Sequence, residues 1–417
     1  MVITKQLDSK IRIVMEEIPY VQSVAIGIWV RAGAVDEEPK YAGISHFIEH
    51  MMFKGTETRS AKKIAGDIDR IGGQINAFTG KEATCYYVKA IYSNYKQAAD
   101  VLVDMLSSSL FDREEMNKER QVICEEIKMT KDAPDELAHD TITSIIFKGS
   151  SLGKSIIGTP TSLKKITHKV MKEYFDEEYT RDNIVISVAG NFDPDDLCNY
   201  FSDKFLGLRE KKDVKKAVNA VYQPSYKVIT KDIEQSHICL AAKGLALNDD
   251  RYYAFSILNN IMGGSMSSRL FQNIREQKGL AYSVYSMAGY FKDDGYFNIY
   301  AGVSHDKIRD AILGIRSELK SLAAAGVTEE ELESSREQLK AAYIFGQENV
   351  SGRMFKNGKN VILNNPILTA EEVISGFDNV TLDDIDQVKS LICDFSAYSA
   401  VAVTRNKLEL KRIMKDN

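Results

Sequence analysis

Three side chains that could together bind a metal ion and move a proton lie within one turn of a predicted helix. His46, Glu49 and His50 form a His-x-x-Glu-His motif. On a helix, positions i, i+3 and i+4 share one face, so both imidazoles and the carboxylate would point the same way. Two imidazoles one turn apart can hold one metal ion, and the carboxylate beside them can accept a proton. The motif is the inverted form of His-Glu-x-x-His and predicts a metal-dependent hydrolase.

The residues around this motif are mostly apolar, which argues against an exposed helix turn with two surface histidines. Polar side chains inside an apolar helix need partners, because buried polar groups must be satisfied. A metal ion would be such a partner for the imidazoles. The apolar neighbours are Ile44, Phe47, Ile48, Met51, Met52 and Phe53.

A third ligand is expected elsewhere in the chain, because catalytic zinc sites usually have three protein ligands and keep a fourth position for water. Residues 119–129 contain no Pro or Gly and are predicted to form a helix. Glu119, Val122, Ile123 and Glu126 share one face of that helix. Carboxylates on an apolar stripe are unusual on a surface helix, although a solvated acidic helix is the alternative. Helix geometry alone leaves the choice between Glu125 and Glu126 open.

Segments in both halves of the chain resemble the pitrilysin-like, or insulinase-type, zinc peptidases. Among these, they are most similar to the branch of the mitochondrial processing peptidase and its bacterial relatives. The resemblance implies a zinc metallopeptidase with Zn²⁺ as its cofactor. The matching segments are residues 43–55, 72–79, 119–126, 263–270 and 275–283.

The resemblance also implies roles for the acidic residues. The family's third metal ligand is a glutamate 76 residues after the second histidine, and counting from His50 reaches Glu126. The family keeps another glutamate seven residues before that ligand, which is Glu119 here and would orient a ligand histidine. Glu49 would be the general base rather than a ligand.

Arg275 and Tyr282 resemble the family's Arg/Tyr pair in the C-terminal half. Tyr282 would then hydrogen-bond the oxyanion of the tetrahedral intermediate, and Arg275 would hold the substrate backbone or the tyrosine. The alternative is an ordinary surface arginine and a core tyrosine.

The segment formed by Asn76, Ala77, Phe78 and Thr79 follows a Gly-Gly turn and precedes a predicted strand at residues 85–90. The resemblance implies an exposed edge strand, to which a peptide substrate could add in extended form through backbone hydrogen bonds. An ordinary hairpin would have the same sequence pattern.

The composition is typical of a globular protein and excludes some function classes. The 417 residues are enough for two or more domains. A net charge of −5 without a basic cluster predicts that the protein does not bind nucleic acid. The five cysteines are scattered, and none lies in a Cys-x-x-Cys pair, which favours a reducing compartment.

The two halves resemble distant copies of one domain. A strand at residues 24–30 leads to the His46 helix, and a strand at 236–242 leads to a helix at 253–261 that has no metal motif. We therefore predict an N-terminal zinc-binding catalytic domain at residues 1–215 and a homologous C-terminal domain at 225–417 that supplies the Arg/Tyr pair. The charged stretch 209–216 and the residues up to 224 are the predicted linker.

Each half mixes strands and helices in an order that predicts the α+β class, with a largely antiparallel sheet and helices mainly on one face. The resemblance implies a clamshell of two such domains. It also implies a homodimer, in which a site could join the N-terminal half of one chain to the C-terminal half of another.

The N-terminal segment lacks a signal peptide's apolar core, and no run of about 18 apolar residues predicts a membrane span. The expected location is cytoplasmic. The expected function is a zinc endopeptidase acting on short or unfolded peptides. The alternative is a non-catalytic or partner-dependent subunit of a processing-peptidase-like heterodimer. The intact His46, Glu49, His50 and Glu126 disfavour a non-catalytic subunit, and the Arg275/Tyr282 pair disfavours an active subunit that needs an inactive partner.

Overall fold

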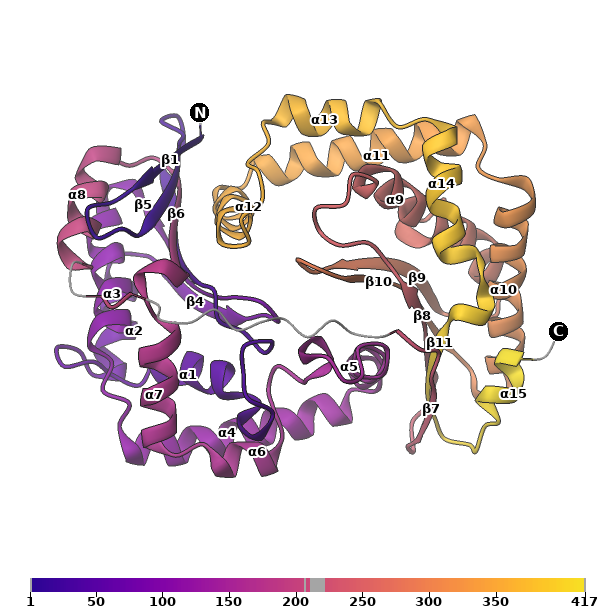
Figure 1. Cartoon of the computed structure of the whole chain (residues 1–417), viewed down its shortest axis with the longest axis horizontal. Coiled ribbons are helices and arrows are strands. Elements are labelled where there is room, and N and C mark those ends of the chain that lie inside the picture. The colour runs from indigo at the N-terminus through magenta and orange to yellow at the C-terminus, as the bar shows by residue number, and fades with distance from the viewer. Residues whose placement is uncertain (1, 206–207, 211–221, 416–417) are drawn as a thin grey trace. The chain divides into compact units, whose positions relative to one another are not determined.

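The computed structural model describes residues 2–205, 208–210 and 222–415, so most of the predicted linker lies outside the described residues. By contact, the chain forms two compact units that exchange segments (Figure 1). The first unit comprises residues 1–127, 154–217 and 345–367, and the second comprises 128–153, 218–344 and 368–417. Each half of the chain thus contributes one helical segment to the other unit. The domain limits drawn from the repeat, 1–215 and 225–417, remain a prediction.

The first unit is built on a six-stranded sheet in the order β1-β2-β6-β3-β5-β4. The central strands β3 and β6 are apolar and buried along nearly their whole length, whereas the edge strand β4 alternates between exposed and half-buried residues. Neighbouring strands are antiparallel except β2 and β6. The strands are β1 (Val2–Gln6), β2 (Arg12–Glu17), β3 (Ser23–Val30), β4 (Gln74–Thr79), β5 (Thr84–Ile91) and β6 (Ile184–Gly190).

Helices cover both faces of this sheet, most of them on one side. A large apolar core joins that face to the helices encoded in the first half of the chain. The opposite face packs against α12 (Val350–Ile362), on the other side of the sheet from α3 and α8 (Figure 1). The helices of the main layer are α1 (Ile44–Met52), α2 (Ala61–Arg70), α3 (Tyr95–Ser108), α4 (Arg113–Asp132), α6 (Pro160–Lys165), α7 (His168–Glu178) and α8 (Pro194–Lys204).

The second unit repeats this plan around a five-stranded sheet in the order β7-β11-β8-β10-β9. Here only β7 and β11 are parallel. The strands are β7 (Tyr226–Thr230), β8 (Ser236–Lys243), β9 (Ser283–Tyr290), β10 (Gly295–Val303) and β11 (Ser399–Thr404).

One helix from the first half of the chain, α5 (Pro134–Ile146), covers one face of the second sheet. The other face packs against the remaining helices of this unit, among which α10 and α14 are neighbours (Figure 1). These helices are α9 (Tyr252–Asn259), α10 (Ile308–Ala325), α11 (Glu329–Gln347), α13 (Ala370–Asp378), α14 (Leu382–Cys393) and α15 (Leu410–Lys415). The predicted α+β class with two largely antiparallel sheets is confirmed.

Matching contacts show how the two copies correspond. Arg120 on α4 donates from Nε and Nη2 to the carbonyls of Leu163 and Ile166, at 3.1 and 2.8 Å. On α11 the guanidinium of Arg336 does the same to two carbonyls at the end of α13, one in its last turn and one just beyond it, at 3.2 and 2.9 Å. Helix α11 is therefore the counterpart of α4, and α9 with the π-helical turn Asn260–Gly264 is the counterpart of α1.

Two further expectations concern the whole described chain. All five cysteines are free. None of the helices in the described ranges combines the length and apolar character that a membrane span needs.

Candidate metal centre

Helix α1 carries the His-x-x-Glu-His motif and is fixed by its own apolar face. Six of its residues are buried, among them Phe47, Ile48 and Met51, so the remaining stripe presents the histidines and Glu49. The helix begins after Gly43, whose φ of +93° suits glycine and whose missing Cβ leaves room for the backbone at Gly158. The apolar flanks therefore set which way the polar stripe points.

A buried carboxylate from the preceding loop caps α1. Glu37 accepts hydrogen bonds from the backbone N–H groups of Gly43 at 2.7 Å and Ser45 at 2.9 Å. These are donors that an isolated helix start would leave unpaired. Burial raises the pKa of Glu37 to about 7, although the two backbone N–H groups oppose that shift. The loop thus ties the start of α1 to the core.

Helix α4 lies against α1 and brings the acidic stripe to it. Glu119 and Ile123 are buried, while Glu126 is half-buried beside the histidines. Val122, which was expected on the same face, is instead exposed. Arg120 secures this contact, because its guanidinium lies over the ring of Phe47 at 5.5 Å. Glu125 is exposed, so the structure places Glu126 and not Glu125 next to the motif.

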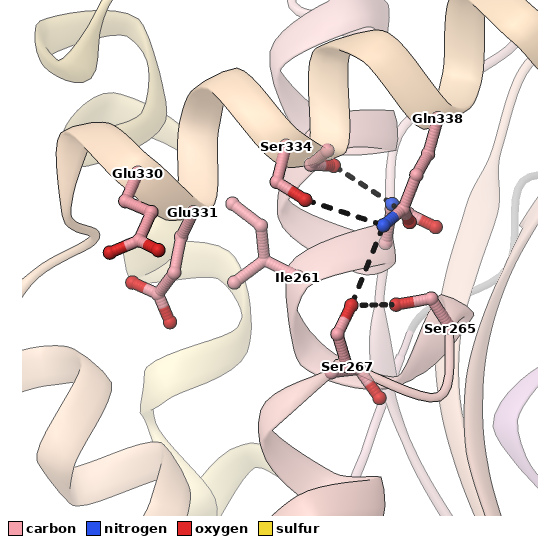
Figure 2. Close-up of a pocket in the computed structure, with 10 residues that line it drawn as sticks. Ile261, Ser265, Ser267, Glu330, Glu331, Ser334 and Gln338 are labelled. Atoms are coloured by element: carbon pink, nitrogen blue, oxygen red, sulfur yellow. Dashed lines mark hydrogen bonds between the residues drawn. The ribbon is translucent and has the colours of Figure 1, made fainter.

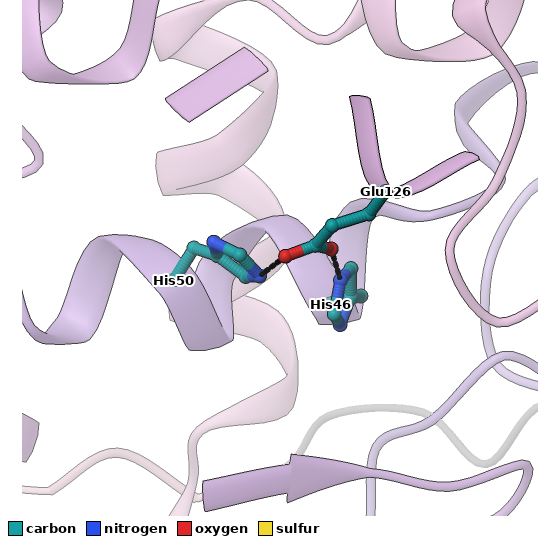
Figure 3. Close-up of side chains that lie close together, drawn as sticks. All are labelled: His46, His50 and Glu126. Carbon is teal, nitrogen blue, oxygen red and sulfur yellow. Dashed lines mark hydrogen bonds and ion pairs between the residues drawn. The ribbon is translucent and has the colours of Figure 1, made fainter. Parts of the chain in front are cut away.

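The three expected ligands converge on one point (Figure 3). The Nε2 atom of His46 lies 3.1 Å from Oε2 of Glu126, and Nε2 of His50 lies 3.6 Å from its Oε1. One ligand atom from each residue lies within 4.8 Å of the others. Metal–ligand bonds of 2.0–2.1 Å in a tetrahedral zinc site separate neighbouring ligand atoms by about 3.3 Å. Two imidazoles and a carboxylate at this spacing therefore fit zinc.

Both histidines present their other ring nitrogen to a second carboxylate. The Nδ1 atom of His50 lies 3.0 Å from Oε2 of Glu119, and a carboxylate can only accept, so Nδ1–H donates. This hydrogen bond leaves the lone pair on Nε2, which faces Glu126. The Nδ1 atom of His46 lies 3.5 Å from Glu49. Glu119 thus occupies the supporting place that the resemblance implied.

The charges of this cluster act on His46. Burial lowers the pKa of His46, but hydrogen bonds and charges from Glu49 and Glu126 outweigh burial and hold the pKa above its usual value. The cluster therefore attracts positive charge to this point, as expected of a cation site.

Strand β4 passes beside Glu49. The hydroxyl of Thr79 donates to Oε2 of Glu49 at 2.5 Å. Among the residues that the structure describes, the strand pairs with β5 alone, so it is one arm of a hairpin and also the edge of the sheet. The predicted edge strand and the alternative hairpin thus describe the same element, and Asn76, Ala77 and Phe78 lie along its free side.

Comparisons with known proteins agree with this geometry. A family model described as insulinase (peptidase family M16) matches residues 12–160, and one described as peptidase M16 inactive domain matches 165–339. An uncharacterized zinc protease of Bacillus subtilis is 42% identical over 377 residues, which span 90% of this chain and 92% of the relative. One from Rickettsia felis is 36% identical over 399 residues, covering 95% of this chain and 96% of its own. The chain belongs to the M16 family of metallopeptidases.

Solved structures share the M16 fold. A peptidase M16 inactive domain from Pseudomonas fluorescens gives a TM-score of 0.90 at 17% identity, covering 98% of both chains. A protease from Helicobacter pylori gives 0.89 at 20% identity, covering 97% of this chain and 99% of its own. These likenesses concern the fold alone.

The Arg/Tyr pair expected of an M16 chain lies in the second unit. Tyr282 precedes β9 and is 74% exposed, which rules out a core tyrosine. The guanidinium of Arg275 lies 5.7 Å from the centre of the Tyr282 ring and 4.7 Å from that of Phe271. The two side chains are therefore neighbours, and the tyrosine hydroxyl is accessible.

Two residues that support the metal centre of this M16 chain could not be identified from its sequence. Lys54 donates to Oε1 of Glu119 at 2.6 Å, and so pairs the buried carboxylate that holds His50. The sequence showed only that Lys54 lies two residues beyond the end of the helix that carries the metal motif. The role of Glu37 could not be predicted, because the sequence does not show which hydrogen bonds a loop residue seven positions before a helix will accept.

A second polar cluster lies in the other unit of this M16 chain, around a cavity of about 180 Å³ between the turn after α9 and α11 (Figure 2). Its groups are neutral amides and hydroxyls with Glu330 and Glu331 at one end. Part of the cluster is hydrogen-bonded internally: Asn260 donates to Ser335 at 3.0 Å and to Gln338 at 2.9 Å. The buried hydroxyl of Ser268 has no hydrogen-bond partner among the described residues. This cluster contains no histidine and does not resemble a metal site.

Proposed function

We propose that this M16 chain is a zinc-dependent endopeptidase that hydrolyses short or unfolded peptides. The observation that carries the proposal is the meeting of α1 and α4. One helix turn presents His46, Glu49 and His50, and Glu126 faces both imidazoles. Relatives that are named zinc proteases support the same chemistry.

His46, His50 and Glu126 would hold the zinc ion. When bound, zinc polarises a substrate carbonyl and lowers the pKa of a bound water to about 7. Glu119, with its charge paired by Lys54, would keep His50 in the tautomer whose Nε2 faces Glu126.

Glu49 is the proposed general base. Its carboxylate would accept a proton from the attacking water and return it to the leaving amine of the cleaved peptide bond. Its side chain is 13% exposed, and its Oε2 lies 3.5 Å from Nδ1 of His46. The carboxylate therefore lies next to the ligands without being one of the three.

The substrate would bind in extended form along the free edge of β4. Backbone groups of Asn76, Ala77, Phe78 and Thr79 would pair with the peptide, which gives affinity without a strict sequence preference. Such pairing requires an unfolded segment, because a peptide within a folded sheet or helix has already used its backbone groups.

Tyr282 is assigned the hydrogen bond to the oxyanion, and Arg275 the contact to the substrate backbone or to the tyrosine. We further propose a homodimer in which one chain's metal centre and another chain's Tyr282 complete each site. Mixing Glu49→Gln chains with Tyr282→Phe chains should then restore activity after subunit exchange, because a mixed dimer has one intact site. No recovery would favour sites built within one chain.

The experiment for the main proposal uses the full chain, an unfolded fluorogenic peptide and metal analysis. The wild-type protein should hold about one zinc per chain and cleave the peptide. Glu49→Gln should keep the zinc while turnover falls by about 10²–10⁴-fold.

Cleavage by a metal-free preparation would contradict the zinc mechanism, and full turnover by Glu49→Gln would remove Glu49 from the role of base. A zinc-loaded wild-type chain that cleaves no unfolded peptide would point to the alternative, a non-catalytic or partner-dependent subunit.

A further inference from the structure

The hydroxyl of Thr79 makes the closest polar contact of the proposed base. Thr79 ends β4 and donates from Oγ1 to Oε2 of Glu49 at 2.5 Å. The Nδ1 atom of His46 lies 3.5 Å from the same Oε2. Oε1 of Glu49 has no hydrogen-bond partner within residues 2–205, 208–210 and 222–415. One oxygen of the carboxylate is therefore held and the other is free.

We infer that Thr79 is a positioning residue that holds Oε2 of Glu49, so that Oε1 is the oxygen that takes the proton. The inference rests on the proposed function and deepens it. A glutamate side chain has several rotatable bonds, and an unheld carboxylate would populate several orientations. Because proton transfer requires hydrogen-bond reach, fixing the orientation raises the fraction of productive encounters.

The strand explains why this hydroxyl points at α1. Successive side chains of a strand alternate between the two faces of the sheet. The ring of Phe78 lies on the α12 face, with its centre 5.6 Å from that of Trp29 and 5.7 Å from that of Phe355. The next residue, Thr79, therefore faces the opposite side, where α1 packs.

The end of the strand is also anchored independently of Glu49. Thr79 pairs with Thr84 across the hairpin, and Thr84 is fully buried with its hydroxyl donated to the carbonyl of Ala32 at 2.8 Å. Removing the Thr79 hydroxyl should therefore leave the strand in place. Thr84 cannot replace the lost donor, because its own hydroxyl is used.

A pair of substitutions at one position tests the inference. Thr79→Val keeps the branched shape that suits a strand and removes the donor, whereas Thr79→Ser keeps the donor. For Thr79→Val we expect kcat on an unfolded peptide to fall by about 10- to 100-fold, with KM, zinc content and Tm unchanged. Thr79→Ser should recover most of kcat. Crystal structures of the zinc-loaded proteins should show Glu49 in one orientation in the wild type and in more than one in Thr79→Val.

The outcomes separate this inference from the proposed function. Wild-type turnover in Thr79→Val, or a loss that appears in KM or that Thr79→Ser shares in full, would overturn the positioning role. If the wild-type chain itself does not cleave peptide, the proposed function fails. The crystallographic readout still decides the contact then, because an unchanged Glu49 orientation in Thr79→Val would contradict the inference without any activity measurement.

Discussion

The same pair of helices occurs twice in this chain, once with charged groups and once with neutral ones. In the first unit, His50 on α1 donates to Glu119 on α4 at 3.0 Å. In the second unit, Asn260 follows α9 and donates to Ser335 on α11, also at 3.0 Å. Glu119 directly precedes Arg120 as Ser335 precedes Arg336, and the two arginines make matching contacts. The two hydrogen bonds therefore occupy corresponding places.

This difference shows what separates a metal centre from a structural contact on one scaffold. The neutral pair is satisfied by nearby uncharged groups, because Asn260 donates to Ser335 and Gln338, and Ser335 donates to the carbonyl of Ile257. The charged pair leaves an imidazole lone pair facing Glu126, and it needs Lys54 to balance Glu119. The fold provides the approach of the two helices, and the residue types decide whether a cation is held there.

The two units differ most in how the carboxylate before the first helix, α1 or α9, makes stability depend on pH. Glu37, which caps α1, has its pKa raised to about 7, mainly by burial. In the second unit, Asp249 lies before α9, and the hydrogen bond from the Arg251 side chain lowers its pKa. Because the folded-state pKa of Glu37 is above the usual glutamate value of 4.5, its contribution to stability is complete below about pH 4.5 and is lost as the pH rises through 7.

For metal-free protein, the free energy of unfolding of the wild type relative to Glu37→Gln should therefore fall by up to about 3 kcal/mol between pH 4.5 and 8. Denaturant titrations of both proteins across this range measure it. A difference that stays constant with pH, or that grows as the pH rises, would remove Glu37 as the cause. Asp249→Asn is the matched control, and it should not reproduce the effect.

The next largest effect is expected on zinc affinity when Lys54 is replaced. Lys54→Met removes the cation that pairs the buried carboxylate of Glu119, so the hydrogen bond that orients His50 weakens. We expect zinc affinity to fall by about 10- to 100-fold, as is usual when a partner of a ligand histidine is lost. Competition with a chelator of known affinity measures the change.

A double-mutant cycle controls this prediction. If Lys54 acts through Glu119, Lys54→Met combined with Glu119→Gln should weaken zinc binding no more than Glu119→Gln alone. Fully additive losses would show that Lys54 acts on the metal centre by another route.

The smallest effect is expected for the neutral pair Asn260 and Ser335 in the second unit, and it concerns stability. Asn260→Ala removes a nearly buried amide and leaves Ser335 and Gln338 without its hydrogen bonds. We expect the protein to lose about 1–2 kcal/mol of stability, measured by denaturant unfolding, with zinc content unchanged. Loss of zinc on this substitution would contradict the assignment of the second cluster to structure alone.

The sequence predicted the part of this site that depends on regular spacing. Residues three, four and seven apart on a helix share a face, so the stripes of α1 and α4 were visible before the structure. The choice of Glu126 over Glu125 came from family spacing, and the structure places Glu126 at the histidines. The edge position of β4 required the resemblance, because alternation alone does not say which strand ends a sheet.

Other features depend on contacts between segments that are distant in the chain. The hydrogen bond from Thr79 to Glu49 and that from Lys54 to Glu119 join different elements, and no local pattern records them. The exchange of α5 and α12 between the units was also not foreseen. A helix with one apolar face carries no information about which sheet it will cover.

Zinc content of two adjacent variants tests the central claim most directly. Glu126→Gln removes a proposed ligand, and Glu125→Gln makes the same chemical change at the exposed neighbour on α4. After dialysis against a zinc buffer that saturates the wild type, Glu125→Gln should hold about one zinc per chain and Glu126→Gln almost none. Equal zinc in both variants, or none in the wild type, would contradict a metal centre formed by His46, His50 and Glu126.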